Sequence, residues 1–279
     1  MSEKPDLSEI EIRSLATPDD YDQCVGLQRD TWGEDFTEVV PPTLLKIPQK
    51  VGGISAGAFG PSGKMVGFVY GVSGLRRGRP AHWSHMLAVT PEFEGRGLGT
   101  HLKVFQRGLL LELGIEVAYW SYDPLEARNA HLNLNRLGAR AVEYVPSMYG
   151  EDTHSTLHSG LGTDRFVVEW ELNDTRVIQA LDGVLPLEIT GTDTPAVASR
   201  AKGGRIVPTE GGLPDLPTVR IEVPENIQTV KAKSIDLGMK WRTTTRRAFL
   251  WYLGRSYRVA AFYRDPGSAR CFYIVSQER

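Results

Sequence analysis

Residues 87–100, LAVTPEFEGRGLGT, constrain the fold more than any other part of this chain. A strand-like pattern ends at Val89, a short connection carries Gly95, Gly97 and Gly99, and an apolar helical pattern begins at once. Glycines let backbone N–H groups approach an anion without a Cβ in the way, and a helix N-terminus adds unpaired donors and a positive dipole end. A pyrophosphate is the ligand that this arrangement favours, and a purely structural glycine turn is the alternative.

The neighbours of these glycines exclude two other phosphate loops. A Walker loop requires Gly-Lys-Ser/Thr, whereas Gly97 is followed by Leu98. A dinucleotide fingerprint opens the first strand–helix unit of a parallel sheet, whereas several strand patterns precede this turn.

The periodicity of apolar residues places the turn inside an α/β pattern that covers residues 8–172. The predicted order is one strand, two helices, three strands, a helix, a strand, a helix and two strands. The expected ranges are 9–16, 21–32, 42–50, 54–59, 64–72, 81–89, 98–113, 117–122, 124–137, 141–145 and 166–172. Asp123-Pro124-Leu125-Glu126 resembles a capping box at the start of the last helix. The predicted fold class is therefore α/β with a mixed sheet.

The 107 residues after position 172 predict a further, smaller part. Gly and Pro supply 11 of the 35 residues from 183 to 217, so residues 173–217 are interpreted as an irregular connecting segment. Residues 218–279 predict a small α+β part with a strand at 219–223, helix over most of 226–254, and strands at 257–264 and 270–275. Because residues 249–262 loosely parallel 133–144, a degenerate half repeat of the first domain is one interpretation.

The composition excludes several classes of partner. Lys and Arg total 32 against 34 Asp and Glu, and this net charge of −2 disfavours electrostatic capture of nucleic acid or an anionic membrane. The densest basic cluster, Arg76-Arg77-Gly78-Arg79, is typical of a solvated hairpin, with phosphate contact as the weaker interpretation. The 2 cysteines are too few for a disulfide scaffold and lack metal-ligand spacing. Without a signal-peptide pattern or an apolar run that could span a bilayer, a cytoplasmic protein is expected.

The segment Glu94-Gly95-Arg96-Gly97-Leu98-Gly99 resembles the Gln/Arg-x-x-Gly-x-Gly/Ala signature of the GCN5-related N-acetyltransferase (GNAT) superfamily, with Glu94 in place of the usual Gln or Arg. The predicted element order also resembles that fold, over about residues 10–172. The resemblance implies a GNAT-like acyl-CoA-binding domain at residues 8–172 and, as cofactor, acetyl-CoA or another acyl-CoA such as succinyl-CoA. The cofactor-binding residues that it implies are Leu87, Val89, Glu94, Gly95, Arg96, Gly97, Leu98, Gly99, Thr100 and Asn129, with backbone amides from Arg96 to Thr100 as donors.

A narrower resemblance is to a bacterial branch of predicted acetyltransferases, some of which are thought to acylate amino acids, for example by N-succinylation. It rests on Trp32-Gly33, Ser84-His85-Met86, the run WSYDPLEARNAHLNLNRLGA and Tyr149-Gly150.

Acyl transfer to an amine needs a base for the ammonium proton and an acid for the leaving thiolate. Enzymes of the superfamily often use a Glu on the fourth strand and a Tyr in the following helix, but this strand reads His82-Trp83-Ser84-His85-Met86 and Leu134 stands at the Tyr position. We expect His85 to be the catalytic base, and a packed structural histidine is the alternative. Tyr149 is the expected acid, with Tyr144 and Tyr122 as other candidates.

The candidate substrate-binding residues are Trp32, Tyr122, Asp123 and Arg165. Three of them have structural alternatives: Trp32 in the core, Asp123 as a helix N-cap, and Arg165, which follows Asp164, in an internal Asp–Arg pair or as a solvated arginine. The sequence therefore predicts an acyl-CoA-dependent N-acyltransferase acting on a small amine such as an amino acid, by direct transfer in a ternary complex. The alternative is a CoA-binding sensor or assembly module without catalysis. A homodimer is left open, and no metal is expected.

Overall fold

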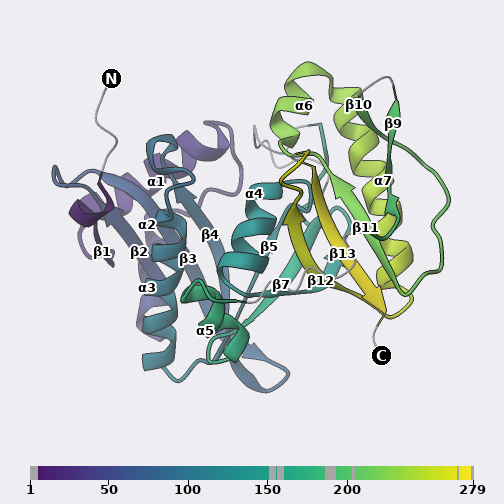
Figure 1. The fold of residues 1–279 in the computed structure, drawn as a ribbon. Helices are drawn as coiled ribbons and strands as arrows, with labels where there is room; N and C mark the ends of the chain where they lie inside the picture. Colours follow the sequence, from purple (N-terminus) through teal and green to yellow (C-terminus); the bar gives the residue numbers. More distant parts are fainter. Residues whose placement is uncertain are drawn as a thin grey trace. The chain divides into compact units, whose positions relative to one another are not determined.

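The computed structural model describes residues 6–150, 155, 160–185, 193–202, 205–268 and 270–277 (Figure 1). The chain divides into two compact units, and the division falls inside one strand, after Trp120. The first unit comprises Met1–Trp120, Thr153–Leu157 and Glu171–Asn173, and the second comprises Ser121–Asp152, His158–Trp170 and Asp174–Arg279.

The first unit follows the predicted order of strands and helices. Its elements are η1 (Leu7–Glu9), β1 (Glu11–Ser14), α1 (Pro18–Trp32), α2 (Pro42–Lys46), η2 (Ile47–Val51), β2 (Ile54–Phe59), β3 (Met65–Arg76), β4 (Arg79–Val89), η3 (Pro91–Phe93), α3 (Leu98–Glu112) and the first part of β5 (Val117–Tyr122). A capping box fixes the start of α1, because Thr17 accepts the backbone N–H of Asp20 while the Asp20 carboxylate accepts that of Thr17.

The sheet of the first unit has the order β1-β2-β3-β4-β5. Its first four strands are antiparallel, and β5 lies parallel to β4. One face packs against α1 and α2 in a hydrophobic cluster that includes Leu27, Leu45, Phe68 and Tyr70. Because α3 packs on the sheet as well, every residue of β2 is buried.

The second unit holds two strand pairs, a four-stranded sheet and a long helix. Its elements are the end of β5, α4 (Ala127–Ala130), η4, which is a π-helix (His131–Arg136), β6 (Arg140–Val145), β7 (Arg165–Glu171), α5 (Thr175–Leu181), β8 (Ala196–Val197), β9 (Ser199–Lys202), β10 (Arg205–Pro208), β11 (Thr218–Val223), α6 (Ile227–Lys233), α7 (Ile235–Leu253), β12 (Tyr257–Arg264) and β13 (Cys271–Gln277). β6 pairs with β7, and a second sheet has the order β12-β13-β11-β8. Their core is aromatic: Phe166, Phe249 and Tyr273 pack with ring centroids 4.8–5.5 Å apart.

The α/β class with a mixed sheet and the predicted element order of residues 8–172 are confirmed. Two expectations are wrong. The last helix of that range begins at Ala127, not at 124, because the Asp123 carboxylate accepts the Leu125 N–H in a turn. Residues 173–217 are not irregular throughout, since α5 starts at the N-cap Asp174 and three short strands follow. Among the described residues, no helix is long and apolar enough to cross a membrane.

Candidate functional site

A bulge in β4 determines where His85 lies. The register of β3 and β4 pairs Tyr70 with Met86 and Gly71 with Ser84, so His85 is the extra residue. Before the bulge, His82 and Ser84 face α3, where both bond to Gln106. After it, Met86 lies in the cluster on the opposite face. The bulge therefore accounts for the change of face between Ser84 and Met86.

β4 parts from β5 just before the bulge. The parallel register contains His82 with Ala118 and Trp83 with Tyr119, whereas β4 continues to Val89. On its other edge β4 stays paired with β3, and the backbone N–H of Thr90 donates to Val66 (2.9 Å). Because backbone groups alternate between the two edges of an antiparallel strand, those of Leu87 and Val89 point away from β3, to the edge that faces the β5 side. Leu87 and Val89 therefore have backbone groups placed to bond a linear amide such as pantetheine.

The glycine turn after β4 leaves backbone donors directed outward. Gly95 and Gly97 have φ of 71° and 97°, a left-handed conformation that glycine tolerates. Gly97 is the N-cap of α3 and has no side chain to cap the helix, so the first-turn N–H groups of Leu98, Gly99 and Thr100 have no acceptor within the helix. A Cβ at Gly97 would meet no protein atom within 4 Å, so space lies open there.

One member of the predicted donor set, Arg96, is engaged already, and so is the neighbouring amide of Glu94. The N–H of Arg96 donates to the Phe93 carbonyl (3.3 Å) and that of Glu94 to the Pro91 carbonyl (3.3 Å). In this structure the turn that precedes the helix thus already uses the amide of Arg96. Three amides at the start of α3 and the positive end of its dipole remain, which suits a pyrophosphate.

His85 keeps part of its surface exposed and lies beside Tyr70, with the ring centroids 6.2 Å apart in an edge-to-face arrangement. Protein atoms around the ring displace water that would hydrate the imidazolium, and this lowers the pKa of His85 below its ordinary value, while the charge of Glu38 opposes the shift. At neutral pH the imidazole is therefore able to accept a proton.

Trp32 packs against the hydrophobic cluster of the first unit. Its ring stacks on Phe36 at 5.6 Å and meets Phe68 edge-on at 6.2 Å. The side chain is only partly buried. The structure thus gives Trp32 a packing role and leaves one part of it at the surface.

Tyr149 lies in the loop after β6, in the second unit. Its hydroxyl is 2.8 Å from Ser121 Oγ, and the guanidinium of Arg165 lies 5.4 Å from the centre of its ring. The backbone of the loop is held by Thr163, whose Oγ1 accepts the Tyr149 N–H (3.1 Å) and donates to the Gly150 carbonyl. The predicted acid is therefore fixed in position within its own unit.

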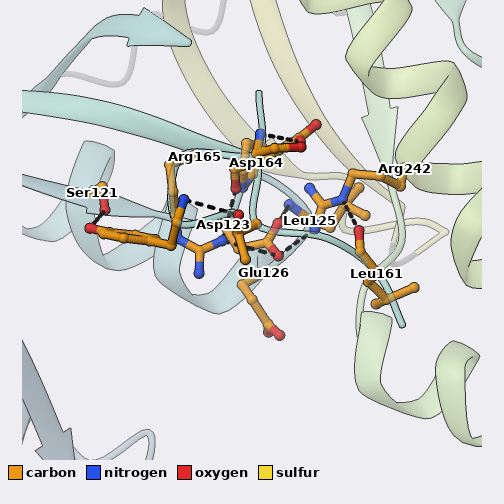
Figure 2. Close-up of polar contacts among 12 residues, drawn as sticks. Ser121, Asp123, Leu125, Glu126, Leu161, Asp164, Arg165 and Arg242 are labelled. Atoms are coloured by element: carbon orange, nitrogen blue, oxygen red, sulfur yellow. Dashed lines mark hydrogen bonds and ion pairs between the residues drawn. The ribbon is translucent and has the colours of Figure 1, made fainter. Parts of the chain in front are cut away.

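A buried group of charges surrounds Asp123 (Figure 2). Asp123 lies between two arginines: Arg242 donates to its Oδ2 at 2.5 Å, and Arg165 is 3.8 Å from the same oxygen. Burial alone would raise the pKa of Asp123, but the two guanidinium charges outweigh it and hold the pKa below its ordinary value. Asp123 is thus engaged in an internal ion pair with both arginines.

The remaining candidates of the second unit lie in different surroundings. Asn129 is exposed on α4. Tyr122 is buried, and its hydroxyl is 3.3 Å from that of Tyr273. Arg165 forms an internal pair with Asp123, whereas the neighbouring Asp164 accepts from Arg246 and from the Tyr144 hydroxyl.

Sequence reasoning missed two polar groups. One is Arg242, which lies on the buried side of α7. The other is the set Lys103 and Gln106, which lies on the buried side of α3 and bonds to Ser84. The signal for Gln106 was its spacing of four residues from the buried Leu102 and Leu110, and Lys103 lies three residues before Gln106. A search for apolar residues passes over both.

No family model matches the sequence, and no curated protein matches it. Solved structures match a part of it. An aminoglycoside 6'-acetyltransferase type Ii has 17% identity over 59% of this chain and 98% of its own, with a TM-score of 0.44. An acetyltransferase of the GNAT family from Streptococcus pneumoniae has 18% identity over 58% and 98%, with a TM-score of 0.45. The ribosomal-protein-S18-alanine N-acetyltransferase from Escherichia coli has 17% identity over 58% and 94%, with a TM-score of 0.43. At these values the likeness assigns no activity to this chain.

Proposed function

We propose that this chain is an acyl-CoA-dependent N-acyltransferase that transfers an acetyl or succinyl group to a small amine, such as an amino acid. The observation that carries the proposal is the end of β4: the backbone groups of Leu87 and Val89 point to the edge that β5 leaves unpaired, and the next turn ends in the open amides of Leu98, Gly99 and Thr100. A linear amide joined to a pyrophosphate matches both donor sets, and coenzyme A has this chemistry.

The thioester of a bound acyl-CoA would supply the acyl group. His85 would take the proton from the acceptor amine, because its lowered pKa keeps the imidazole neutral at pH 7, whereas an amine with an ordinary pKa of about 10 arrives mostly protonated. Tyr149 would donate a proton to the thiolate, with Ser121 orienting its hydroxyl. Trp32, Tyr122, Asp123 and Arg165 stay candidates for the acceptor side, and Asn129 for the cofactor.

Direct transfer is favoured over an acyl-cysteine intermediate. Cys24 and Cys271 are both buried, and burial raises the pKa of each thiol, to about 12 and about 11. Neither thiol is therefore a ready nucleophile.

The test is to incubate the protein with acetyl-CoA or succinyl-CoA and a panel of amino acids and other small amines, while free thiol is followed and N-acyl products are identified by mass spectrometry. We expect amine-dependent thiol release. Calorimetric binding of CoA without turnover on any amine would support the non-catalytic module instead. Absence of CoA binding would overturn both.

A further inference from the structure

The interface between β4 and α3 contains polar side chains where apolar ones are the rule. His82, Ser84, Lys103 and Gln106 are all buried, with exposed fractions of 0–4%. Burying such groups costs free energy unless every donor and acceptor is paired, so a network of this kind is informative. None of these residues has a part in the proposed chemistry.

Gln106 is the centre of the network. Its side-chain oxygen accepts from Ser84 (2.9 Å) and from Lys103 (3.0 Å), and its Nε2 lies 3.0 Å from Nε2 of His82. Because an amide nitrogen only donates, Nε2 of His82 must be the acceptor, and the imidazole proton lies on Nδ1. From there it bonds to Ser73 Oγ (2.9 Å), which donates to the carbonyl of Gly52 (2.6 Å). In this series of hydrogen bonds, from Gln106 through His82 and Ser73 to Gly52, each donor and acceptor is then defined.

The same residues frame the bulge that carries His85. The imidazole of His82 occupies the place of a side chain at Gly71: a Cβ there would lie 2.3 Å from its Nε2. Gly71 is paired with Ser84, and the register shift follows directly. Gln106 therefore bonds to His82 and Ser84, the two β4 side chains that face α3 just before the extra residue, His85.

We propose that Gln106 is a positioning residue for His85, which holds β4 in its bulged register by fixing His82 and Ser84 to α3. The role in catalysis rests on the proposed function, but the positioning itself does not. Without the amide, two buried polar groups lose their partner, and a strand free to slip by one residue turns its side chains to the other face. α3 begins at the open amides, so one helix would position both the cofactor contact and the base.

The experiment follows the His85 imidazole by NMR titration in the wild-type protein and in Gln106→Met, with His85→Gln used to assign the resonance. Met has a similar length but cannot bond to His82 or Ser84. We expect the His85 pKa to move upward, because the ring leaves its place near Tyr70 for water. In Gln106→Glu, whose carboxylate accepts from Ser84, Lys103 and a protonated His82, we expect the wild-type titration to return. Leu110→Val, another buried position of α3, is the control for general loosening of the helix.

Kinetics add a second measurement. In Gln106→Met we expect kcat to fall by about 10–100-fold while KM for the acyl-CoA changes less than about twofold. A folded Gln106→Met protein with an unchanged His85 titration would overturn the proposal, and so would Leu110→Val shifting it equally. If Gln106→Met does not fold, His82→Phe removes the same link and is read in the same way. If the His85 pKa shifts in Gln106→Met but the wild-type protein shows no turnover, the result would support Gln106 as the residue that positions His85 and would count against the proposed acyltransferase activity.

Discussion

Lys103 gives the sharpest test of the physical reasoning, because a lysine is rarely buried completely. Its ammonium group lies 2.8 Å from Ser84 Oγ and 3.6 Å from the centre of the Trp120 ring. Burial lowers the pKa of Lys103 well below its ordinary value. In the unfolded chain Lys103 has a pKa of about 10.4. There is therefore a range of pH in which Lys103 is protonated in the unfolded chain but not in the folded one.

The sign and size of the effect follow from linkage. Above pH 10.4 the amine is neutral in both states, and the residue carries no penalty. As the pH falls, the unfolded state alone takes up the proton, so Lys103 costs stability down to the lowered pKa of the folded state. Inside that window each pH unit changes the free energy of unfolding by about 1.4 kcal/mol.

The substitution Lys103→Met removes the titrating group and leaves Ser84 bonded to Gln106. We expect the variant to be more stable than the wild type at pH 7, and its advantage to shrink by up to about 1.4 kcal/mol per pH unit between pH 7 and 10. Urea unfolding at a series of pH values, followed by circular dichroism, measures the difference. Lys64→Met, at an exposed lysine, is the control and should show no such slope. A constant difference between Lys103→Met and wild type would refute the reasoning, because Lys103 would then stay protonated in the folded protein.

Three further outcomes are expected. Gly97→Ala should lower CoA affinity more than Gly63→Ala does. Both glycines have positive φ and open space at Cβ, so the backbone costs of the two substitutions are alike. Calorimetry compares the two affinities, and equal values would show that the Gly97 turn is not part of the CoA site. The acidic limb of kcat/KM should lie below pH 6.5, because the pKa of His85 is lowered, and His85→Gln should abolish that limb; a limb above pH 6.5 would point to another base. Asp123→Asn should lower the free energy of unfolding, measured in urea, by about 3–5 kcal/mol, because Arg242 is left buried without its counter-charge. Asp174→Asn, in an exposed pair with Arg140, should lower it by less than about 1 kcal/mol. Equal losses in the two variants would contradict the burial argument.

The order of elements was predictable because it depends on local signals. The period of apolar residues distinguishes strand from helix, and the glycine turn with its following helix marks one end of β4. β5 and β12 have the predicted bounds, since turns or glycines flank both. The helix α5 was missed: at seven residues it is too short to show a clear period inside a segment rich in Gly and Pro.

The candidate site was predictable only in its backbone part. The open amides of α3 follow from glycine and helix geometry, which are local. The bulge at His85 is not, because it depends on the close packing of His82 over Gly71 across two strands. The ion pair of Asp123 with Arg242 joins residues 119 positions apart, so the sequence offered only a helix cap or a substrate contact for Asp123.

The most direct test of the central claim is an amide NMR titration of the protein with CoA. We predict the largest shifts at the backbone N–H groups of Leu98, Gly99 and Thr100, where the pyrophosphate would bind, and at Leu87 and Val89 along β4. Shifts confined to other parts of the chain, with these five amides unmoved at saturation, would contradict the claim that this end of β4 and the start of α3 bind an acyl-CoA.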